Sequence, residues 1–406
     1  MASGSGDLAV SGASRRKVAV VTGTRAEWGL LAPVCEAICA RSELALEVCA
    51  GGAHLLKPPV AEDPALHRAV FGEPMPWEPT IIWVESCGYH PHRFEMQRAG
   101  ETGRLADAAA LGRGVSALAE IFARLAPDIV VVLGDRIEAF AAASAASIGG
   151  IRVAHIHGGD RAEGVADEAM RHAITKLAHI HFAASAESAA RIARLGEDAA
   201  RIHLVGSPAV DGLDAIPPLS DHEYAELGAP DFLFLMHPVG RPDADEEREA
   251  HAALEALAAR GRVTALAPNS DPGRNGIARA IEIVGKRRRD RVRSFSHLAR
   301  ERFIGLLRRT DVRAIVGNSS AGLIECAALG VRAVNIGARQ AGRERADNAR
   351  DAASAWDGLA EALDTLDSWR PSGRHPYLEA GASHRIAEIL ATCDFSAHGL
   401  AKRCTY

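Results

Sequence analysis

The sequence lacks the features that mark several specialised classes of protein. Its 406 residues carry a formal net charge of −5. The clustered basic excess typical of nucleic-acid-binding proteins is missing, so nucleic acid is not an expected partner. The one basic run, at residues 286–289, is interpreted as a solvated helix end. No stretch approaches the roughly 18 uninterrupted apolar residues that a membrane-spanning helix needs, so a membrane is not an expected partner either.

The seven cysteines also lack any pattern of pairing. Their number is odd and no C-x-x-C spacing occurs, which argues against a disulfide framework and against a zinc ribbon. A cytoplasmic location is therefore expected. Residues 1–16 are rich in glycine, serine and alanine and end in Arg15 and Arg16. This reverses the charge-then-apolar order of a signal peptide, so a disordered arm is predicted there.

The sequence does have the pattern of an α/β protein. With 48% hydrophobic residues the chain can bury more than one core, and its length favours two domains. Short β-branched runs alternate with amphipathic stretches, which predicts parallel sheets with helices on both faces. The predicted fold class is α/β, with two Rossmann-like, doubly wound parallel-sheet domains that face each other across a cleft. The predicted segments are the arm at 1–16, a first domain at 17–213, a turn-rich linker at 214–228, a second domain at 229–375, and a last helical segment at 376–406 that packs back.

The first motif, Thr22-Gly23-Thr24-Arg25, joins a predicted strand to a predicted helix. Small residues let the backbone approach an anion, and both the helix N-terminus and Arg25 favour negative charge. The motif is therefore typical of phosphate or carboxylate binding, although an ordinary turn with a surface arginine is an equal alternative.

The second motif, Gly134-Asp135-Arg136, follows an apolar strand. An acid and a base side by side are costly to bury unless they are paired or used, which favours a position in the cleft. Asp135 also suits the start of a helix, so a helix cap is the alternative.

The third motif, His-x-His-Gly-Gly-Asp, covers residues 155–160 and precedes a predicted helix with Asp167, Glu168 and Arg171. The two histidines of a strand point the same way, and the helix brings its charged residues toward the same mouth. This density of titratable groups favours acid–base chemistry and substrate contact, with structural capping as the alternative. A His-x-His metal site lacks a further ligand at a convincing spacing, so neither a metal nor another cofactor is expected.

The fourth motif runs from Gly317 to Glu325 and again combines a strand end, a small-residue turn and a helix predicted at 321–329. Hydroxyls and free backbone N–H groups at such a helix start make a phosphate cradle, and Glu325 can reach ribose hydroxyls. Arg339 and Arg343 follow the next strand, where a guanidinium can complete nucleotide binding.

His237 and the segment 269–271 end two further predicted strands on the same rim. As lone residues they are more typical of satisfied loop positions than of a binding site.

Taken in order, these motifs resemble the hydrolysing UDP-N-acetylglucosamine 2-epimerases of sialic-acid-type pathways. Val205-Gly206-Ser207-Pro208 and Arg339-Gln340-x-Gly342-Arg343-Glu344 belong to the same resemblance, which covers most of residues 17–350. It implies the glycosyltransferase-B arrangement of two Rossmann-like domains. It also implies an enzyme that eliminates UDP from UDP-N-acetylglucosamine and adds water to give N-acetylmannosamine or a related 2-epimer. A homodimer or tetramer is the expected assembly.

Carried over motif by motif, the resemblance implies two groups of functional residues. The implied nucleotide contacts are Arg25, Arg136, His237, Asn269, Ser319, Ser320, Glu325 and Arg339, and the residues implied around the sugar are Asp135, Asp167 and Arg171. Further candidates for substrate binding are His54, Asp271, Gly322 and Arg343.

The chain departs from the family's pattern in two places. Many relatives carry His-x-Glu-Gly-Gly, whereas this chain has His157 in place of the glutamate. The proton donor or acceptor is then His157 itself, or it has moved to Asp160 or Glu168. Residues 55–104 do not match the family's usual sugar-side loop, so the sugar or the acceptor can differ.

Two other functions are consistent with this scaffold. One is an enzyme of secondary metabolism that forms a C–N or glycosyl bond on a sugar phosphate or sugar nucleotide. The other is a non-catalytic sugar-nucleotide sensor, which would not need the acidic set Asp135, Asp160, Asp167 and Glu168.

Overall fold

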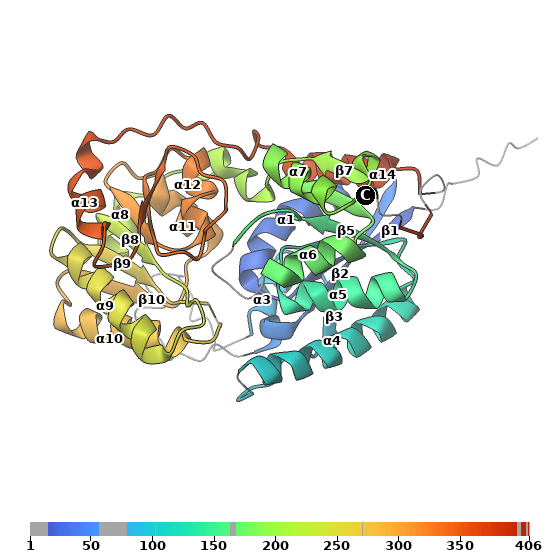
Figure 1. Ribbon diagram of the computed structural model, residues 1–406, viewed down its shortest axis with the longest axis horizontal. Helices are drawn as coiled ribbons and strands as arrows, with labels where there is room; N and C mark the ends of the chain where they lie inside the picture. The colour runs from blue at the N-terminus through green and yellow to red at the C-terminus, as the bar shows by residue number, and fades with distance from the viewer. Residues whose placement is uncertain are drawn as a thin grey trace, which may run out of the picture.

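The computed structural model describes residues 15–56, 79–101, 103–162, 168–269, 271–395, 399–402 and 405. Within these ranges the chain forms two parallel sheets flanked by helices (Figure 1). This arrangement confirms the predicted α/β class with two doubly wound parallel sheets. Of the predicted N-terminal arm, residues 1–14 lie outside the described residues, and Arg16 already begins the first strand.

The first sheet has seven parallel strands in the order β3-β2-β1-β4-β5-β6-β7. Val20 of β1 lies opposite both Val48 of β2 and Val131 of β4. The strand order reverses between β1 and β4, and ligands of open α/β sheets bind at such a switch point, beyond the carboxyl ends of the strands. The strands are β1 (Arg16–Thr22), β2 (Leu44–Gly51), β3 (His92–Phe94), β4 (Ile129–Leu133), β5 (Arg152–Ile156), β6 (Ile180–Ala183) and β7 (Ile202–Leu204).

The second sheet has six parallel strands in the order β10-β9-β8-β11-β12-β13. Here the order reverses between β8 and β11, where Leu235 lies opposite Gly317. The two sheets therefore share one topology, with a switch point each. The strands are β8 (Phe232–Leu235), β9 (Val263–Leu266), β10 (Val292–Phe295), β11 (Ala314–Gly317), β12 (Ala333–Ile336) and β13 (Ala349–Ala352).

Helices cover both faces of each sheet, because the strands are apolar on both sides and need cover on both. One face of the first sheet packs against α4 (Arg104–Leu125), α5 (Ile137–Ile148) and α6 (Glu168–Leu177), and the other packs against α1 (Arg25–Cys39) and α3 (Ile81–Ser86). A further helix, α7 (Ala186–Arg194), connects β6 to β7 along the chain. The second sheet is covered by α9 (Asp243–Ala258), α10 (Arg274–Arg287) and α13 (Leu359–Asp364) on one face, and by α8 (Asp221–Glu226), α11 (Arg300–Leu307) and α12 (Glu325–Ala328) on the other.

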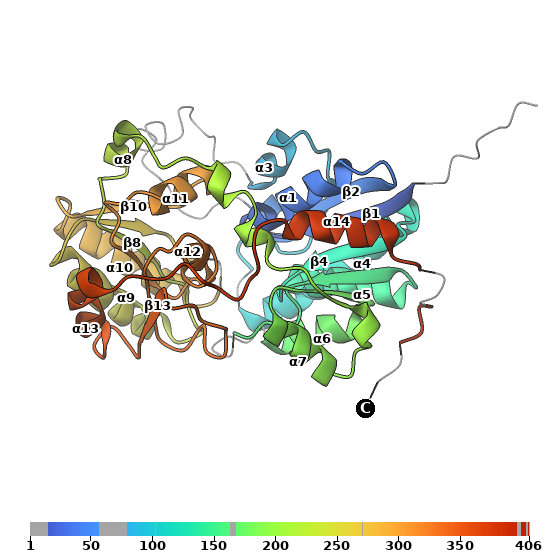
Figure 2. The same cartoon turned by 90° about the horizontal axis from the view of Figure 1, so that it is seen from above.

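The last helix, α14 (Ala382–Thr392), returns from the second sheet and packs against α1 of the first (Figure 2). Its first turn is held by Asp211, whose carboxylate oxygens accept hydrogen bonds from the backbone nitrogens of Gly381, Ala382 and Ser383 at 2.5, 3.0 and 2.7 Å. A carboxylate at a helix N-terminus satisfies donors that have no partner within the helix. The segment after β7, which contains Asp211, is thus hydrogen-bonded to the start of α14.

The prediction of one continuous helix over residues 321–329 is wrong. The structure has a 3₁₀ turn at Ser320–Gly322 and, after a break at Leu323 and Ile324, the single-turn helix α12. The N–H groups at the start of this segment are already used, because Ala321 donates to Ser319 Oγ and Gly322 donates to Ser319 O. This segment therefore does not present the row of free N–H groups that a long helix start offers.

Candidate active site

Asp135, at the end of β4, forms an ion pair with Arg171 of α6. Arg171 is buried, and its Nη1 also donates to the backbone oxygen of His157 at 3.1 Å. The guanidinium is therefore held between the loop after β4 and the loop after β5. The Asp135 side chain keeps 19% of its surface exposed, so its carboxylate is fixed in orientation and still accessible.

His157 belongs to a buried polar cluster at the end of β5. Its φ of 64° is uncommon for a residue with a side chain. Nδ1 lies 3.0 Å from Asp160 Oδ2 and Nε2 lies 3.0 Å from Ser207 Oγ, while Asp160 Oδ1 accepts from Ser188 Oγ at 2.8 Å. Burial raises the pKa of Asp160, but the contacts with His157 and then with Arg343 outweigh it and hold that pKa below its usual value. Both His157 nitrogens and both Asp160 oxygens are thus engaged.

The two acidic residues predicted beside Arg171 have different outcomes. Asp167 lies outside the described residues. Glu168 is the first residue of α6, and its Oε2 accepts a hydrogen bond from Ala162 N at 2.7 Å, while its Oε1 lies 3.4 Å from His172 Nε2. Glu168 therefore fastens the loop after β5 to α6.

The turn after β1 is organised by Glu27 of α1. Glu27 Oε2 accepts from Gly23 N at 2.8 Å and from Thr24 N at 3.1 Å, and Thr24 completes a capping box with Glu27. Arg25 begins α1, and its guanidinium carbon lies 4.4 Å from the ring centroid of Trp83, in a cation–π contact. The predicted anion-binding turn is thus built around a buried acid.

His54, in the 3₁₀ turn Gly52–Leu55, is buried behind this turn. Its Nε2 lies 3.0 Å from Thr22 Oγ1 and its Nδ1 lies 2.9 Å from Thr80 Oγ1. Burial lowers the pKa of His54 to about 4, so the ring is neutral at neutral pH. This geometry favours a role in bracing the loops after β1 and β2.

In the second sheet, His237 and Asn318 join the ends of β8 and β11. Asn318 Oδ1 accepts from His237 N at 2.7 Å, and Asn318 Nδ2 donates to His237 O at 2.8 Å. His237 Nδ1 accepts from Asn269 N at 3.1 Å, and Asn269 Nδ2 donates to Asp271 at 2.5 Å. Burial, followed by the charges of Arg339 and Arg136, lowers the pKa of His237. The His237 ring at the switch point of the second sheet is therefore held in its neutral form.

The loop after β11 contains the remaining nucleotide candidates. Ser319 precedes the 3₁₀ turn that contains Ser320 and Gly322. A Cβ on Gly322 would lie 3.2 Å from that of Ala333, so this glycine lets the turn approach β12 closely. Burial raises the pKa of Glu325, whose Oε1 lies 3.9 Å from Arg300 Nη1.

Three polar contacts cross the seam between the two sheets and bring the two sets of residues together. Arg136 Nη1 lies 3.5 Å from Asp271 Oδ1, and Arg343 Nη1 lies 3.5 Å from Asp160 Oδ2. Ser185 donates to Glu344. On the second side of the seam, Arg339 Nη1 donates to the backbone oxygen of Asn318 at 3.2 Å. Of the predicted residues, Arg136 and Asp160 of the first half therefore meet Asp271 and Arg343 of the second half across the seam.

Sequence reasoning missed several polar residues that take part in this seam. They are Gln97, Glu138, Ser185, Ser188, Ser207 as a partner of His157, and Glu344 as a partner of Ser185. The glutamate two residues after Gly134-Asp135-Arg136 is a signal that could have been used, because a charge in the first turn of an otherwise uncharged helix needs a partner. The serines gave no comparable signal.

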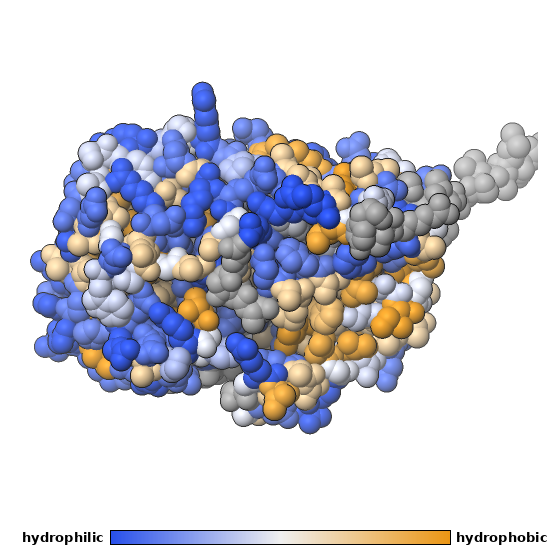
Figure 3. All heavy atoms as spheres, viewed as in Figure 1, coloured by the Kyte–Doolittle hydropathy of each residue, from blue (hydrophilic) through white to orange (hydrophobic). Residues whose placement is uncertain are grey.

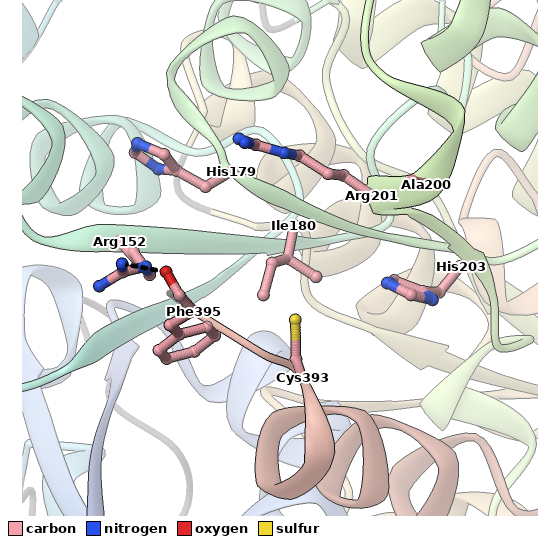
Figure 4. Close-up of a pocket in the computed structure, with 8 residues that line it drawn as sticks. All are labelled: Arg152, His179, Ile180, Ala200, Arg201, His203, Cys393 and Phe395. Atoms are coloured by element: carbon pink, nitrogen blue, oxygen red, sulfur yellow. Dashed lines mark hydrogen bonds between the residues drawn. The ribbon is translucent and has the colours of Figure 1, made fainter. Parts of the chain in front are cut away.

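A small cavity of about 10 Å³ lies far from the seam, where the C-terminal tail crosses the amino ends of β5, β6 and β7 (Figure 4). Arg152 Nη2 donates to the backbone oxygen of Phe395 at 2.7 Å, and its guanidinium lies 4.6 Å from the Phe395 ring. This volume holds about one water molecule. The cavity is a packing gap under the tail and not a substrate site.

Two kinds of feature are absent from the described residues. In that part of the chain, no group of three or more His, Cys, Asp and Glu side chains is placed to hold a metal ion. Likewise, none of the described helices is long and apolar enough to cross a membrane.

Comparison with known proteins gives consistent results. The family model described as UDP-N-acetylglucosamine 2-epimerase matches residues 92–391. The chain is 33% identical over 384 residues to the hydrolysing UDP-N,N'-diacetylbacillosamine 2-epimerase of Legionella pneumophila, covering 93% of this chain and 96% of that protein. It is 27% identical to the hydrolysing GDP/UDP-N,N'-diacetylbacillosamine 2-epimerase of Campylobacter jejuni, covering 87% of this chain and 88% of that one.

The fold is also that of a solved structure, the UDP-GlcNAc 2-epimerase of Neisseria meningitidis bound to UDP-GlcNAc. The TM-score is 0.71 at 17% sequence identity, covering 92% of this chain and 99% of that one. At this identity the similarity shows the fold.

Proposed function

This chain belongs to the UDP-N-acetylglucosamine 2-epimerase family, and we propose that it is the hydrolysing enzyme for a UDP-linked 2-acetamido sugar, with a 2,4-diacetamido sugar as the first candidate. UDP is eliminated and water is added to give the free 2-epimer. The observation that carries the proposal is that the Asp135–Arg171 pair stands at the seam where Arg136 meets Asp271 and Asp160 meets Arg343 of the second sheet. The candidate sugar rests on the names of the two bacillosamine-type relatives.

In the proposed reaction, Asp135 acts on the sugar. Elimination requires removal of the C2 proton by a positioned base, and hydration requires a proton delivered to C2 from the opposite face. The ion pair with Arg171 orients the accessible Asp135 carboxylate for one of these steps. Asp167, which lies outside the described residues, is proposed for the other step.

The nucleotide is proposed to lie against the second sheet and the turn after β1. Departure of UDP places negative charge on its β-phosphate, which guanidinium groups stabilise. Arg25, Arg136, Arg339 and Arg343 supply such groups from both sides of the seam. Glu325 and the serines at 319 and 320 are proposed to contact the ribose and the phosphates.

The proposal assigns His157 and Asp160 a supporting role. Their side chains bond each other, Ser207 and Ser188 in a buried cluster, and Arg343 joins them from the second sheet. The cluster therefore helps to fix the position of the second sheet relative to the first. A group whose polar atoms are all engaged is poorly placed to exchange protons with a sugar.

Exchange of hydrogen at C2 tests the reaction. The chain is incubated in D₂O with UDP-N-acetylglucosamine, with a UDP-2,4-diacetamido sugar and with their GDP counterparts, and products are analysed by mass spectrometry. The expected result is free 2-epimer with one deuterium at C2, together with released UDP. Product that retains its C2 hydrogen would contradict elimination and indicate direct displacement at C1.

We further propose that the chain forms a homodimer or tetramer through the outer face of α4, α5 and α6. An apolar area covers this side of the first sheet in Figure 3. Phe140 and Leu177 are only partly buried there, and Ile148 and Leu105 are 83% and 89% exposed. Exposed apolar patches of this kind mark interfaces. Ile148→Glu is expected to reduce the molar mass measured by light scattering, with Ile283→Glu on α10 as the control.

A cytoplasmic location is proposed as well. It rests on the described cysteines, which are free and include the buried Cys35, Cys49 and Cys326.

A further inference from the structure

Glu138 is a buried acid that the proposed reaction does not use. It is the only charged residue of α5, and its side chain is 0% exposed. A Cβ on Gly23 would lie 2.2 Å from Glu138 Cγ, and a Cβ on Gly52, which has a φ of 58°, would lie 2.6 Å from it. The glycines after β1 and β2 therefore make room for this side chain, and the turns close around it.

The carboxylate of Glu138 has two polar neighbours. Oε1 accepts a hydrogen bond from Gln97 Nε2 at 2.6 Å, and Oε2 lies 3.5 Å from Arg136 Nε. A buried carboxylate is very costly without a compensating cation. Arg136, two residues earlier in the chain, supplies that cation and is itself held by the pairing.

Glu27 stands on the other side of the same turns and engages their backbone. Burial, followed by the charge of Glu138, raises the pKa of Glu27 to about 8. Glu27 is therefore mostly protonated at neutral pH, and it is occupied by the backbone nitrogens of Gly23 and Thr24. The ion pair that Arg136 Nε makes within the first half is with Glu138.

Arg136 has a second acidic partner of a different kind. Its Nη1 lies 3.5 Å from Asp271 Oδ1 of the opposite sheet, and the Asp271 side chain is 22% exposed. One guanidinium thus has a buried partner, Glu138, and a more accessible partner, Asp271, whose place an incoming anion can take.

We propose that Glu138 is a positioning residue: from between the two glycine turns it holds the Arg136 guanidinium at the seam, where the diphosphate of the substrate replaces Asp271. Glu138 does not touch the substrate and acts through Arg136. The inference rests on the proposed function in taking the anion to be the diphosphate of a UDP-sugar.

The test is a double-mutant cycle read out by UDP binding in calorimetry. Glu138→Gln keeps the size of the side chain and the acceptor for Gln97, and removes the charge. It is expected to weaken UDP binding about tenfold in the wild-type background and to have no further effect in an Arg136→Met background. Asp271→Asn is expected to tighten UDP binding, because the competing carboxylate is gone. Unchanged affinity in Glu138→Gln, or an equal loss in both backgrounds, would overturn the proposal.

Two further variants serve as a control and as an alternative to Glu138→Gln. Glu197→Gln is the matched control, since Glu197 is a buried glutamate whose Oε2 lies 3.2 Å from His181 Nε2, away from the seam. It is expected to lower the melting temperature and to leave UDP affinity unchanged. If Glu138→Gln does not fold, Gln97→Met removes the other contact of the same carboxylate, and a weaker loss of UDP affinity that again disappears with Arg136→Met is expected.

Because UDP binding requires no turnover, the cycle is independent of the reaction. If the coupling between Glu138 and Arg136 is present in UDP binding while no UDP-sugar is epimerised, the proposed function fails and the role of Glu138 stands.

Discussion

The two switch points have the same topology, but different polar groups hold the ends of their strands. At the first, beyond β1 and β4, buried charges are paired, as in Asp135 with Arg171 and Glu138 with Arg136. At the second, beyond β8 and β11, the amide of Asn318 holds the backbone of His237 through neutral hydrogen bonds. Strand order therefore decides where a site can form, and the side chains at the strand ends decide what it can do. In the proposed reaction, Asp135 beside the first switch point handles protons, and arginines from both sides of the seam bind the nucleotide.

The strongest challenge to this comparison is Asp135→Asn. We expect turnover to fall by about 100-fold or more with UDP affinity retained, because a general acid or base contributes roughly 10²–10⁴-fold. Steady-state kinetics and calorimetry check this, with the exposed Asp290→Asn as the control. A variant with near wild-type turnover would show that Asp135 is only a partner for Arg171.

Asn318→Leu tests the second switch point, beyond β8 and β11. It removes the partners of His237 N and His237 O, and leaving such groups unsatisfied costs about 1–3 kcal/mol each. We expect a lower melting temperature and a raised KM for the UDP-sugar, with a smaller effect on kcat. A loss confined to kcat would contradict the division between the two ends.

Glu325→Ala is expected to weaken UDP binding by about 1–3 kcal/mol, as for a charged partner removed from ligand hydroxyls. Glu325 is 9% exposed and lies 3.9 Å from Arg300. The same measurement on Arg300→Met shows whether Glu325 contacts UDP directly or acts only by positioning Arg300. Unchanged UDP affinity in Glu325→Ala would remove this residue from the nucleotide site.

Asp211→Ala should have the smallest effect on the reaction, because it lies outside both switch points. It removes the acceptor for three backbone N–H groups at the start of α14 and should cost about 0.5–2 kcal/mol of unfolding free energy. Thermal unfolding measures the loss, and kcat is expected to stay within about twofold. A large fall in kcat would mean that α14 sets the approach of the two sheets.

Sequence reasoning located the strand ends that carry the site more reliably than it located the contacts there. Apolar β-branched runs such as 129–133 predict buried strands directly, since side chains of a parallel sheet are buried on both faces. Residues 321–329 show the limit, because their composition suits a helix while packing of Gly322 against Ala333 favours a tighter turn. Gly23 shows a second limit, because nothing near it in the sequence indicates that it leaves room for the Glu138 side chain.

By itself the sequence determined the alternation of strands and helices, the two halves and the places where functional residues leave each strand, because these depend on local patterns of hydrophobicity and on turn residues. Only the tertiary structure decided which charges are paired. His157 and Asp160 look like open acid–base candidates in sequence, yet Ser207 and Ser188 close over them from segments 50 and 28 residues away. Residues far along the chain supply the partners of buried charges such as Asp160, because the cost of a desolvated charge depends on what lies next to it in space.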